Sequence, residues 1–470
     1  MILPFLRPRA GRWLVERRSH CGMVSTPRRR LRPLIAMLVL SLLALAACGG
    51  GDDASESGSA CAPSGEKVTI DFWSWVPGIE HAVELWNEQH PDIQVNLSKV
   101  PDGRAGTYQN YNNAIRAGRG TPDLGMIEYD RLPDYRLQNA LENIGPCGAA
   151  AARDQFVDYT WPLVTFGEQD AVYAVPEDTG PMVLYYRADL FEQYGIEVPR
   201  TWEQFAQAAD EVAARGNGAH LTNLAPVDFG GWFAALAWQN GARWFDWDDE
   251  GWTVTIDDEP TRQVADLWQQ MIDNGDLSEV PTFTEEWNRA LAEDQLLSWV
   301  GAAWGGKLIE LGAPSTEGKW AVAPLPQWQE GAQASANWGG STYAVFEGSD
   351  HPYEATQFAL WLNTHPESVA ILNEEGGAYP AAADGTRLPA LTGPQPFFGD
   401  RDIYQVINEA AGNIDHDWVW GPTMSTTFST LEDEMAGVLD GAQSFRDALD
   451  ATQRETVEDL QAQSLTVTER

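Results

Sequence analysis

Apolar and polar positions near the start of the folded chain alternate between two periods, one typical of strands and one of helices. β-branched and aromatic residues over 68–73 predict a strand, and residues 93–97 alternate apolar and polar as a second strand does. Between them, apolar residues at helical spacing predict a helix over 80–90 that stops before Pro91. We therefore expect the ordered part to open with a β-α-β unit.

The same two periods recur along the rest of the chain, without a tandem repeat. Further strands are predicted at 123–127, 172–175, 182–186, 321–323 and 343–346. Further helices are predicted at 108–117, 201–214, 229–240, 262–274, 353–363, 401–412 and 424–460. Strands that alternate with helices favour an α/β fold with central sheets.

The residues before this pattern are typical of an export signal. An arginine cluster over 28–32 precedes an apolar run over 34–45, which is too short to span a bilayer. The run ends in Leu-Ala-Ala-Cys, which resembles the lipobox of bacterial lipoproteins and implies that Cys48 is lipidated. An ordinary cleaved signal is the alternative.

We expect residues 1–47 to be removed, and Met23 is a second candidate for the true start of translation. Small, polar and acidic residues over 48–66 cannot bury a core and predict a flexible tether. The protein is then expected at the extracellular face of the membrane, held by its lipid, away from ATP and NAD. We expect no cofactor.

Composition excludes one class of partner and predicts one covalent link. The formal net charge is −39, and so acidic a chain repels nucleic acid and anionic lipid headgroups. Four cysteines occur; Cys21 and Cys48 lie in the leader or at its end, which leaves Cys61 and Cys147. In an oxidising compartment this pair predicts a disulfide, with two free thiols as the alternative.

Several segments, taken in order behind the leader, resemble the extracellular solute-binding proteins of carbohydrate ABC transporters. They are DFWSWVPG (71–78), GTPDLGMIEYDRLPDY (120–135), YAVPEDTGPMVLYYRADLFEQYGIEVPRTWEQF (173–205), GKWAVAPLPQW (318–328), NWGGSTYAVF (337–346) and FALWLNTHPES (358–368). The resemblance implies a two-lobe α/β fold of the type II periplasmic-binding-protein kind, which closes around a ligand.

The resemblance also implies that the chain crosses three times between the lobes. We expect the crossings near 176–180, 324–329 and 376–381, each of which contains Gly or Pro and suits a hinge. The N-terminal lobe is then 67–177 plus 327–378, and the C-terminal lobe is 178–326 plus 379–470.

A sugar site needs aromatic rings against its C–H faces and fixed acids or amides for its hydroxyls. The chain has 21 Trp, most of which must be structural, so position has to select the few that bind. The ligand-binding candidates are Trp75, Glu128, Tyr129, Asp130, Asp178, Trp304, Trp338, Gly339, Gly340 and Trp420.

Two of these candidates carry roles implied by the resemblance. Asp130, followed by Arg131, matches an Asp-Arg pair whose Asp binds sugar hydroxyls, and Trp304 matches a tryptophan that stacks on sugar. An aromatic residue precedes that pair in the family, where this chain has Ile127, so Tyr129 is expected to replace it. The structural alternatives are acids at a helix N-terminus and core packing of the indole.

Two other motifs are weaker. Residues 301–308 (GAAWGGKL) fit G-x-x-x-x-G-K without the Ser or Thr that holds magnesium, which disfavours nucleotide binding. Acids alternate from Asp246 to Glu250, with Gly251 at the sixth position and Asp257 at the twelfth, as in half of a calcium-binding loop. The strand-like alternation over 252–256 favours a hairpin instead, with calcium binding as the alternative. The seven His show no metal-ligand spacing, and we expect no metal site.

Taken together, the sequence predicts a monomeric, non-catalytic receptor that captures an oligosaccharide and passes it to an ABC permease. A secreted glycoside hydrolase is the first alternative, because a chain with so many acids has enough carboxylates to supply the pair that such an enzyme needs. A binding protein for another solute, such as a polyol, a glycerol derivative or a peptide, is the second. A purely structural surface lipoprotein is the third.

Overall fold

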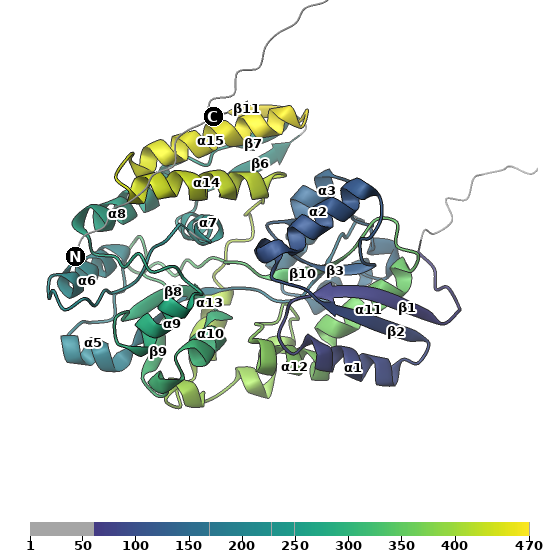
Figure 1. Cartoon of the computed structure of the whole chain (residues 1–470), viewed down its shortest axis with the longest axis horizontal. Coiled ribbons are helices and arrows are strands. Elements are labelled where there is room, and N and C mark those ends of the chain that lie inside the picture. Colours follow the sequence, from purple (N-terminus) through teal and green to yellow (C-terminus); the bar gives the residue numbers. More distant parts are fainter. Residues whose placement is uncertain (1–60, 169, 227, 249, 470) are drawn as a thin grey trace, which may run out of the picture. The chain divides into compact units, whose positions relative to one another are not determined.

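The computed structural model describes residues 61–168, 170–226, 228–248 and 250–469. Its largest sheet has five strands in the order β2-β1-β3-β10-β4 (Figure 1). The first three strands run parallel, and β10 lies antiparallel between β3 and β4. Their bounds are β1 Val68–Ser74, β2 Ile93–Lys99, β3 Leu124–Glu128, β4 Val175–Pro176 and β10 Ser341–Val345.

Helices cover this first sheet because their apolar residues face it. Alternate residues of β1 are buried, as the strand pattern predicts, and α1 buries Ile79, Val83 and Trp86. α1 also packs along α11 and α12. The helices that accompany this sheet are α1 Ile79–Gln89, α2 Tyr108–Ala117, α3 Leu132–Leu137, α4 Trp161–Thr165, α11 Pro352–Thr364 and α12 Pro366–Gly376.

A second sheet has three strands in the order β8-β5-β9, with β5 antiparallel to both neighbours. Their bounds are β5 Met182–Arg187, β8 Ser298–Ala302 and β9 Trp320–Pro324. Residues 182–185 are fully buried, as expected for a strand covered on both faces. The helices around it are α5 Ala188–Tyr194, α6 Trp202–Ala213, α7 Phe229–Gln239, α9 Glu285–Ala292, α10 Gly305–Gly312 and α13 Ile403–Ala411.

A third, small sheet has the order β11-β7-β6 and lies next to three long helices. β6 Phe245–Asp248 and β7 Gly251–Val254 form an antiparallel hairpin, and β11 Val467–Glu469 adds to it in parallel. The predicted hairpin is confirmed. The helices are α8 Glu259–Asn274, α14 Met424–Leu439 and α15 Phe445–Ala462.

One predicted helix is wrong in its extent. The range 424–460 forms two helices, because the chain turns after α14 and restarts at Ser444. Ser444 and Asp447 form a capping box, in which each side chain binds the other residue's backbone N–H. By contrast, α6 begins close to the start of its predicted range 201–214, where the Thr201 hydroxyl caps the helix by accepting a hydrogen bond of 3.2 Å from Gln204 N. The short 3-10 and π turns are 103–107, 145–147, 150–155, 158–160, 314–316, 385–387, 389–391 and 396–398.

The chain passes between the first two sheets in segments that are hydrogen-bonded to one another. Glu177 N donates to Ser341 O at 2.9 Å, and Thr179 N donates to Tyr379 O at 2.8 Å. Gly180 N donates to Asn337 Oδ1 at 2.7 Å. Three segments far apart in sequence therefore lie side by side. Two of them lie where the sequence places crossings, at 176–180 and 376–381, whereas the third, 337–341, lies beyond the crossing expected near 324–329.

Residues 327–335 still contact elements beside the second sheet. Gln327 N donates to Arg200 O, and Ser335 N donates to Asn413 O. The boundary between lobes stays a prediction, and these contacts favour a second crossing that reaches the first sheet between Asn337 and Ser341.

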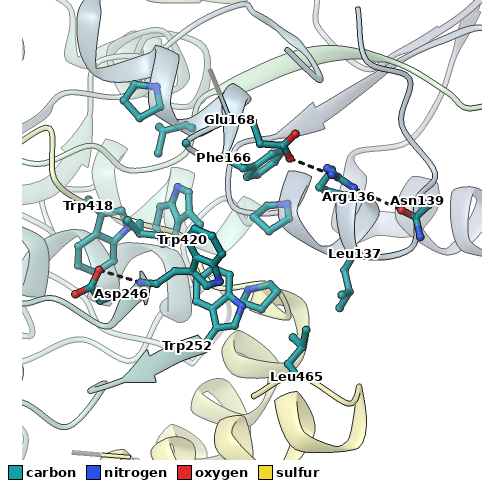
Figure 2. Close-up of a pocket in the computed structure, with 17 residues that line it drawn as sticks. Arg136, Leu137, Asn139, Phe166, Glu168, Asp246, Trp252, Trp418, Trp420 and Leu465 are labelled. Carbon is teal, nitrogen blue, oxygen red and sulfur yellow. Dashed lines mark hydrogen bonds and ion pairs between the residues drawn. The ribbon is translucent and has the colours of Figure 1, made fainter. Parts of the chain in front are cut away.

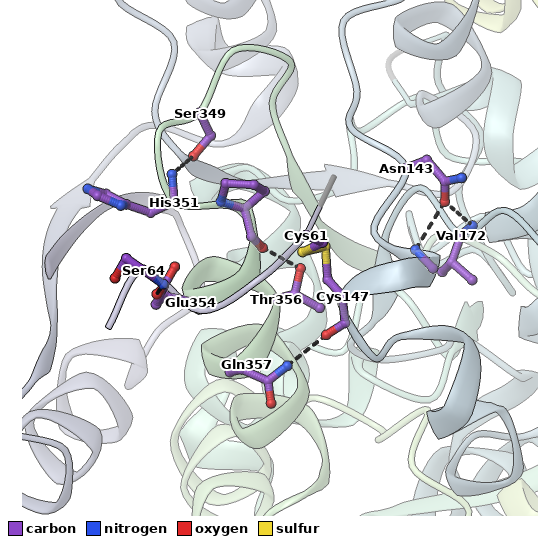
Figure 3. The surroundings of a disulfide bond; sticks show 12 residues. Cys61, Ser64, Asn143, Cys147, Val172, Ser349, His351, Glu354, Thr356 and Gln357 are labelled. Carbon is purple, nitrogen blue, oxygen red and sulfur yellow. Dashed lines mark hydrogen bonds between the residues drawn. A yellow bond between two sulfur atoms is a disulfide. The ribbon is translucent and has the colours of Figure 1, made fainter. Parts of the chain in front are cut away.

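A disulfide joins Cys61 to Cys147, which are 86 positions apart in sequence, with the two Cα atoms 5.1 Å apart (Figure 3). Gln357 Nε2 of α11 donates to Cys147 O at 2.8 Å, and Ser64 N donates to Glu354 Oε1 at 2.7 Å. The start of the described chain is thus fixed to α11. The predicted leader, tether and lipidated Cys48 lie outside the described residues. Within the described ranges, no helix is both long enough and apolar enough to cross a bilayer.

Candidate ligand-binding site

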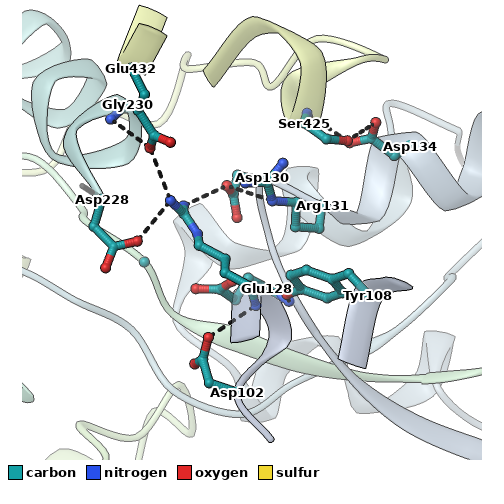
Figure 4. Close-up of polar contacts among 12 residues, drawn as sticks. Asp102, Tyr108, Glu128, Asp130, Arg131, Asp134, Asp228, Gly230, Ser425 and Glu432 are labelled. Carbon is teal, nitrogen blue, oxygen red and sulfur yellow. Dashed lines mark hydrogen bonds and ion pairs between the residues drawn. The ribbon is translucent and has the colours of Figure 1, made fainter. Parts of the chain in front are cut away.

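Arg104 forms ion pairs with acids from several elements; these acids are labelled in Figure 4. It follows β2, and its Nη1 lies 2.9 Å from Asp228 Oδ1 at the start of α7 and 3.3 Å from Glu432 Oε1 of α14. Its Nη2 lies 3.7 Å from Asp130 Oδ2, after β3. We call Arg104, Glu128, Asp130, Asp228 and Glu432 the Arg104 cluster. It connects elements of the first sheet with helices that accompany the other two.

Asp130 is the most buried acid of this cluster, with 6% of its surface exposed. Its Oδ2 lies 3.5 Å from Arg131 Nε but has no hydrogen-bond partner within the described part of the chain. A buried carboxylate oxygen in this state can accept a hydrogen bond from a hydroxyl that a ligand brings.

Glu128 ends β3 and is held by an aromatic neighbour. The Tyr108 hydroxyl donates to Glu128 Oε2 at 2.9 Å, and Glu128 N donates to the same hydroxyl oxygen at 3.1 Å. Burial, with the nearby charge of Asp130, raises the pKa of Glu128 to about 7, although Arg104 opposes the shift. Burial likewise raises the pKa of Glu432. Four carboxyls thus surround the one guanidinium of the cluster, and Arg131 lies beside Asp130 as a second cation.

Trp75 lies beside this cluster through Tyr108. The two rings meet edge to face, with centroids 5.9 Å apart, and the indole is only partly buried. Arg104 and Tyr108 were missed by the sequence analysis, because they stand in no motif and their partners are distant along the chain.

Trp304, which follows β8 of the second sheet, packs in a group of aromatic side chains. It precedes α10, and its Nε1 donates to Trp338 O at 3.2 Å, with the ring centroids 5.0 Å apart. Phe283 and Trp299 also pack against Trp304. Trp338 is buried, whereas Trp304 stays partly exposed, so Trp304 is the indole that can offer a face to a ligand.

Gly231 of α7 shows that these two groups meet. A Cβ atom there would lie 3.3 Å from Trp338 Nε1 and 3.7 Å from Arg104 Nη2. The absence of a side chain at this position thus lets the aromatic group and the Arg104 cluster approach the same turn of helix. Gly339, with φ +70°, turns the chain beside Trp304.

Asp178 and Gly340 lie in the crossing segments, and Tyr129, which follows β3, packs against them. Asp178 Oδ1 accepts a hydrogen bond of 2.7 Å from Ser341 N, and burial raises the pKa of Asp178 to about 7. Gly340 has φ +89°, and a Cβ there would lie 3.0 Å from Asp178 O and 3.1 Å from the Tyr129 ring. With only 1% of its surface exposed, Tyr129 has no free face for the stacking role that the sequence analysis gave it, because this contact and the core cover its ring.

Trp420 is also enclosed, with 7% of its surface exposed. Its ring meets Phe428 edge to face at 6.0 Å, and the Arg104 and Arg131 guanidinium carbons lie 5.9 and 5.7 Å from the centre of the same Phe428 ring. Trp420 therefore reaches the Arg104 cluster only through Phe428. Its other neighbours line a separate cavity (Figure 2).

The weaker motifs have structural explanations. Asp246 Oδ1 and Asp248 Oδ1 accept from the backbone N–H groups of Trp247 and Glu250 in the β6–β7 hairpin, and Asp257 pairs with Arg262 at 2.6 Å. No group of three or more His, Cys, Asp or Glu that could hold a metal occurs among the described residues.

The chain was compared with known proteins. The sequence model described as bacterial extracellular solute-binding protein matches residues 73–368. A lactose-binding protein of Rhizobium radiobacter is 30% identical over 73% of this chain and 82% of its own length. An arabinooligosaccharide-binding protein of Halalkalibacterium halodurans is 25% identical over 76% of this chain and 82% of its own.

Solved structures agree. The galacto-N-biose/lacto-N-biose I-binding protein of a Bifidobacterium longum ABC transporter, in complex with lacto-N-biose, superposes with a TM-score of 0.77 at 27% identity. It covers 86% of this chain and 100% of its own. An ABC transporter associated binding protein of B. animalis subsp. lactis, in complex with β-1,6-galactobiose, has a TM-score of 0.75 at 25% identity, with the same coverage. The predicted periplasmic-binding-protein fold is confirmed, and the chain belongs to the bacterial extracellular solute-binding protein family, whose members bind solutes and are not enzymes.

Proposed function

We propose that this protein binds an oligosaccharide between the Arg104 cluster and the Trp304 indole, and delivers it to the permease of an ABC transporter. The relatives named above are described as binding lactose, arabinooligosaccharides, lacto-N-biose and galactobiose, which supports this class of ligand.

The observation that carries the proposal is the composition of the Arg104 cluster. One guanidinium lies within 4 Å of three carboxylates, and a fourth carboxylate, Glu128, lies next to them. Such a site has surplus acceptors, so it favours a neutral ligand with many hydroxyl donors and repels an anionic one. An anionic solute, such as a phosphorylated glycerol derivative, therefore fits least.

We expect the two lobes to close on the ligand, because the residues that contact it come from different sheets. Asp130 follows β3 of the first sheet, whereas Trp304 follows β8 of the second. A ligand held by both gains contacts only when the two lobes are together, and this differential affinity is what shifts the population to the closed form. We place the hinge in the hydrogen-bonded crossing segments at 176–182, 337–341 and 376–381.

A titration of Trp304→Ala tests the site. We expect the variant to bind lactose or arabinotriose, whichever the wild type binds, about 1–3 kcal/mol more weakly by calorimetry, as for the loss of an aromatic stacking platform. Trp361→Ala is the matched control, because Trp361 is also partly buried but stacks on His365 of the distant α11–α12 corner. Equal affinities of Trp304→Ala and wild type, with a large loss of apo stability, would place Trp304 in the core.

Delivery further requires that the protein stays outside the cell and at the membrane. We assign this to lipidation of Cys48, so that the protein works as an anchored monomer. Mass spectrometry of the N-terminal peptide from membranes should find a diacylglyceryl group on Cys48, and Cys48→Ser should release the protein into the medium. Retention of Cys48→Ser in the membrane fraction would refute the anchor.

A further inference from the structure

A cavity of about 680 Å³ lies apart from the Arg104 cluster and carries an unusual density of tryptophan (Figure 2). Its walls come from α3 and α4 beside the first sheet, from the β6–β7 hairpin, and from the segment before α14. Four indoles line it: Trp247, Trp252, Trp418 and Trp420. Of these, only Trp420 was a ligand-binding candidate from the sequence.

The hairpin presents two of these indoles on one face. Trp247 and Trp252 are directly opposite in the antiparallel register, so their side chains project to the same side of the ribbon. Trp247 is 60% exposed, although an indole is usually mostly buried. An exposed indole beside a second one, at the mouth of a cavity, forms a flat surface of the kind that packs against a sugar ring.

The inner wall leaves polar atoms unused. Trp418 and Trp420 are both more than nine-tenths buried, and neither indole Nε1–H finds an acceptor among the residues that the structure describes. Buried donors without partners are rare and costly. Either N–H can donate to a hydroxyl oxygen of a bound sugar only if its indole turns toward the cavity when the sugar binds.

The rim adds hydrogen-bonding groups of both kinds. Arg136 Nη2 lies 3.0 Å from Glu168 Oε1, and both residues line the cavity together with Asn139 and the exposed Asp246. Amide, guanidinium and carboxylate groups around an aromatic floor match a ligand that has hydroxyls at its edge and C–H groups on its faces.

We infer that this cavity is a second carbohydrate site, distinct from the one between the Arg104 cluster and Trp304. Phe428 and Trp420 separate the two sites, and the second wall is built by residues that the first does not use. Because α3 and α4 accompany the first sheet while the hairpin belongs to the third, a sugar bound here contacts elements of both proposed lobes.

The indole signals of ¹⁵N-labelled protein test the inference directly. In Trp304→Ala protein, whose first site is weakened, millimolar lactose or arabinotriose should still shift the Nε1–H signals of Trp252, Trp418 and Trp420. Sodium decanoate serves as the apolar-chain probe. Shifts by decanoate and not by either sugar, or no shift with any of the three, would overturn the site.

Variants make the test specific. Trp247→Ala removes an exposed side chain and should weaken the sugar-dependent shifts of Trp418 and Trp420 about fivefold or more, as expected for a lost stacking surface. Leu311→Ala, whose side chain is 64% exposed on α10, is the control and should change nothing. Unchanged shifts in Trp247→Ala would also overturn the inference. If the second site responds but the Trp304 signal of wild-type protein does not, the proposed function fails while this inference stands.

Discussion

Asp134 offers the sharpest test of the charge balance in this protein. It lies on α3, and its two carboxylate oxygens accept hydrogen bonds from the backbone N–H and the hydroxyl of Ser425, in α14. Burial raises the pKa of Asp134 from 3.8 to about 7, although Ser425 and Arg131 act in the opposite direction. The folded protein therefore holds a proton on Asp134 that the unfolded chain releases.

This difference fixes how stability depends on pH. The favourable contribution is fully present below about pH 4 and is lost as the pH rises through 7, because ionising the carboxyl then costs more in the folded state. A shift of this size corresponds to at most about 4 kcal/mol at pH 8, and solvent screening of a partly exposed group reduces it to about 2 kcal/mol. Asp134→Asn keeps the shape and an acceptor for Ser425 but removes the charge.

Urea denaturation measures the effect. Asp134→Asn should be about 2 kcal/mol more stable than wild type at pH 8 and less than half as much at pH 5, because pH 5 already lies above the unfolded pKa of 3.8. Asp154→Asn, an exposed acid on the same lobe whose side chain makes no hydrogen bond or ion pair among the described residues, is the control and should show no such pH-dependent gain. A gain of the same size at both pH values, or a loss at pH 8, would refute the assignment of the raised pKa to Asp134.

Three further predictions follow from the same contacts. Arg104→Gln should weaken oligosaccharide binding by about tenfold in calorimetry, because it leaves the acids of its cluster unpaired; unchanged affinity would remove Arg104 from the site. Gly340→Ala should lower the free energy of unfolding by about 1–3 kcal/mol, owing to its positive φ and the 3.0 Å approach to Asp178 O, and wild-type stability would contradict this. Replacing Cys61 and Cys147 together by Ser should cost about 2–4 kcal/mol in urea unfolding, whereas a reducing agent should have no further effect on that variant.

Local sequence signals predicted the elements of the fold well. The strand at 68–73 is found as β1, and the Thr201 cap starts α6, because each depends on neighbours within a few residues. The break between α14 and α15 was missed, since apolar spacing continues through it and the capping pair at Ser444 was not weighed. Periodicity therefore locates helices but does not by itself end them.

The candidate site was harder to predict, because its geometry depends on contacts that are remote in sequence. Arg104 binds Asp228 and Glu432, which are 124 and 328 residues away, and no spacing along the chain announces such a cluster. The burial of a tryptophan is equally hard to predict, even for two tryptophans that are close in sequence. Trp244 is fully buried and Trp247 is the most exposed indole named here, although only three positions separate them.

The structure shows that some of the chain's many acids are buried. From composition alone, the acidity of the chain indicates solubility, and most of the acids do lie in solvent. At Glu128, Asp134 and Asp178, however, burial raises the pKa to about 7, so these carboxyls are costly to keep ionised at neutral pH. Of these, Glu128 and Asp178 are ligand-binding candidates, and a ligand that donates hydroxyl hydrogens to them lowers that cost when it binds. Binding of a neutral sugar should therefore be accompanied by proton release, which calorimetry in buffers of different ionisation enthalpy can measure, and an equal apparent enthalpy in all buffers would exclude this coupling.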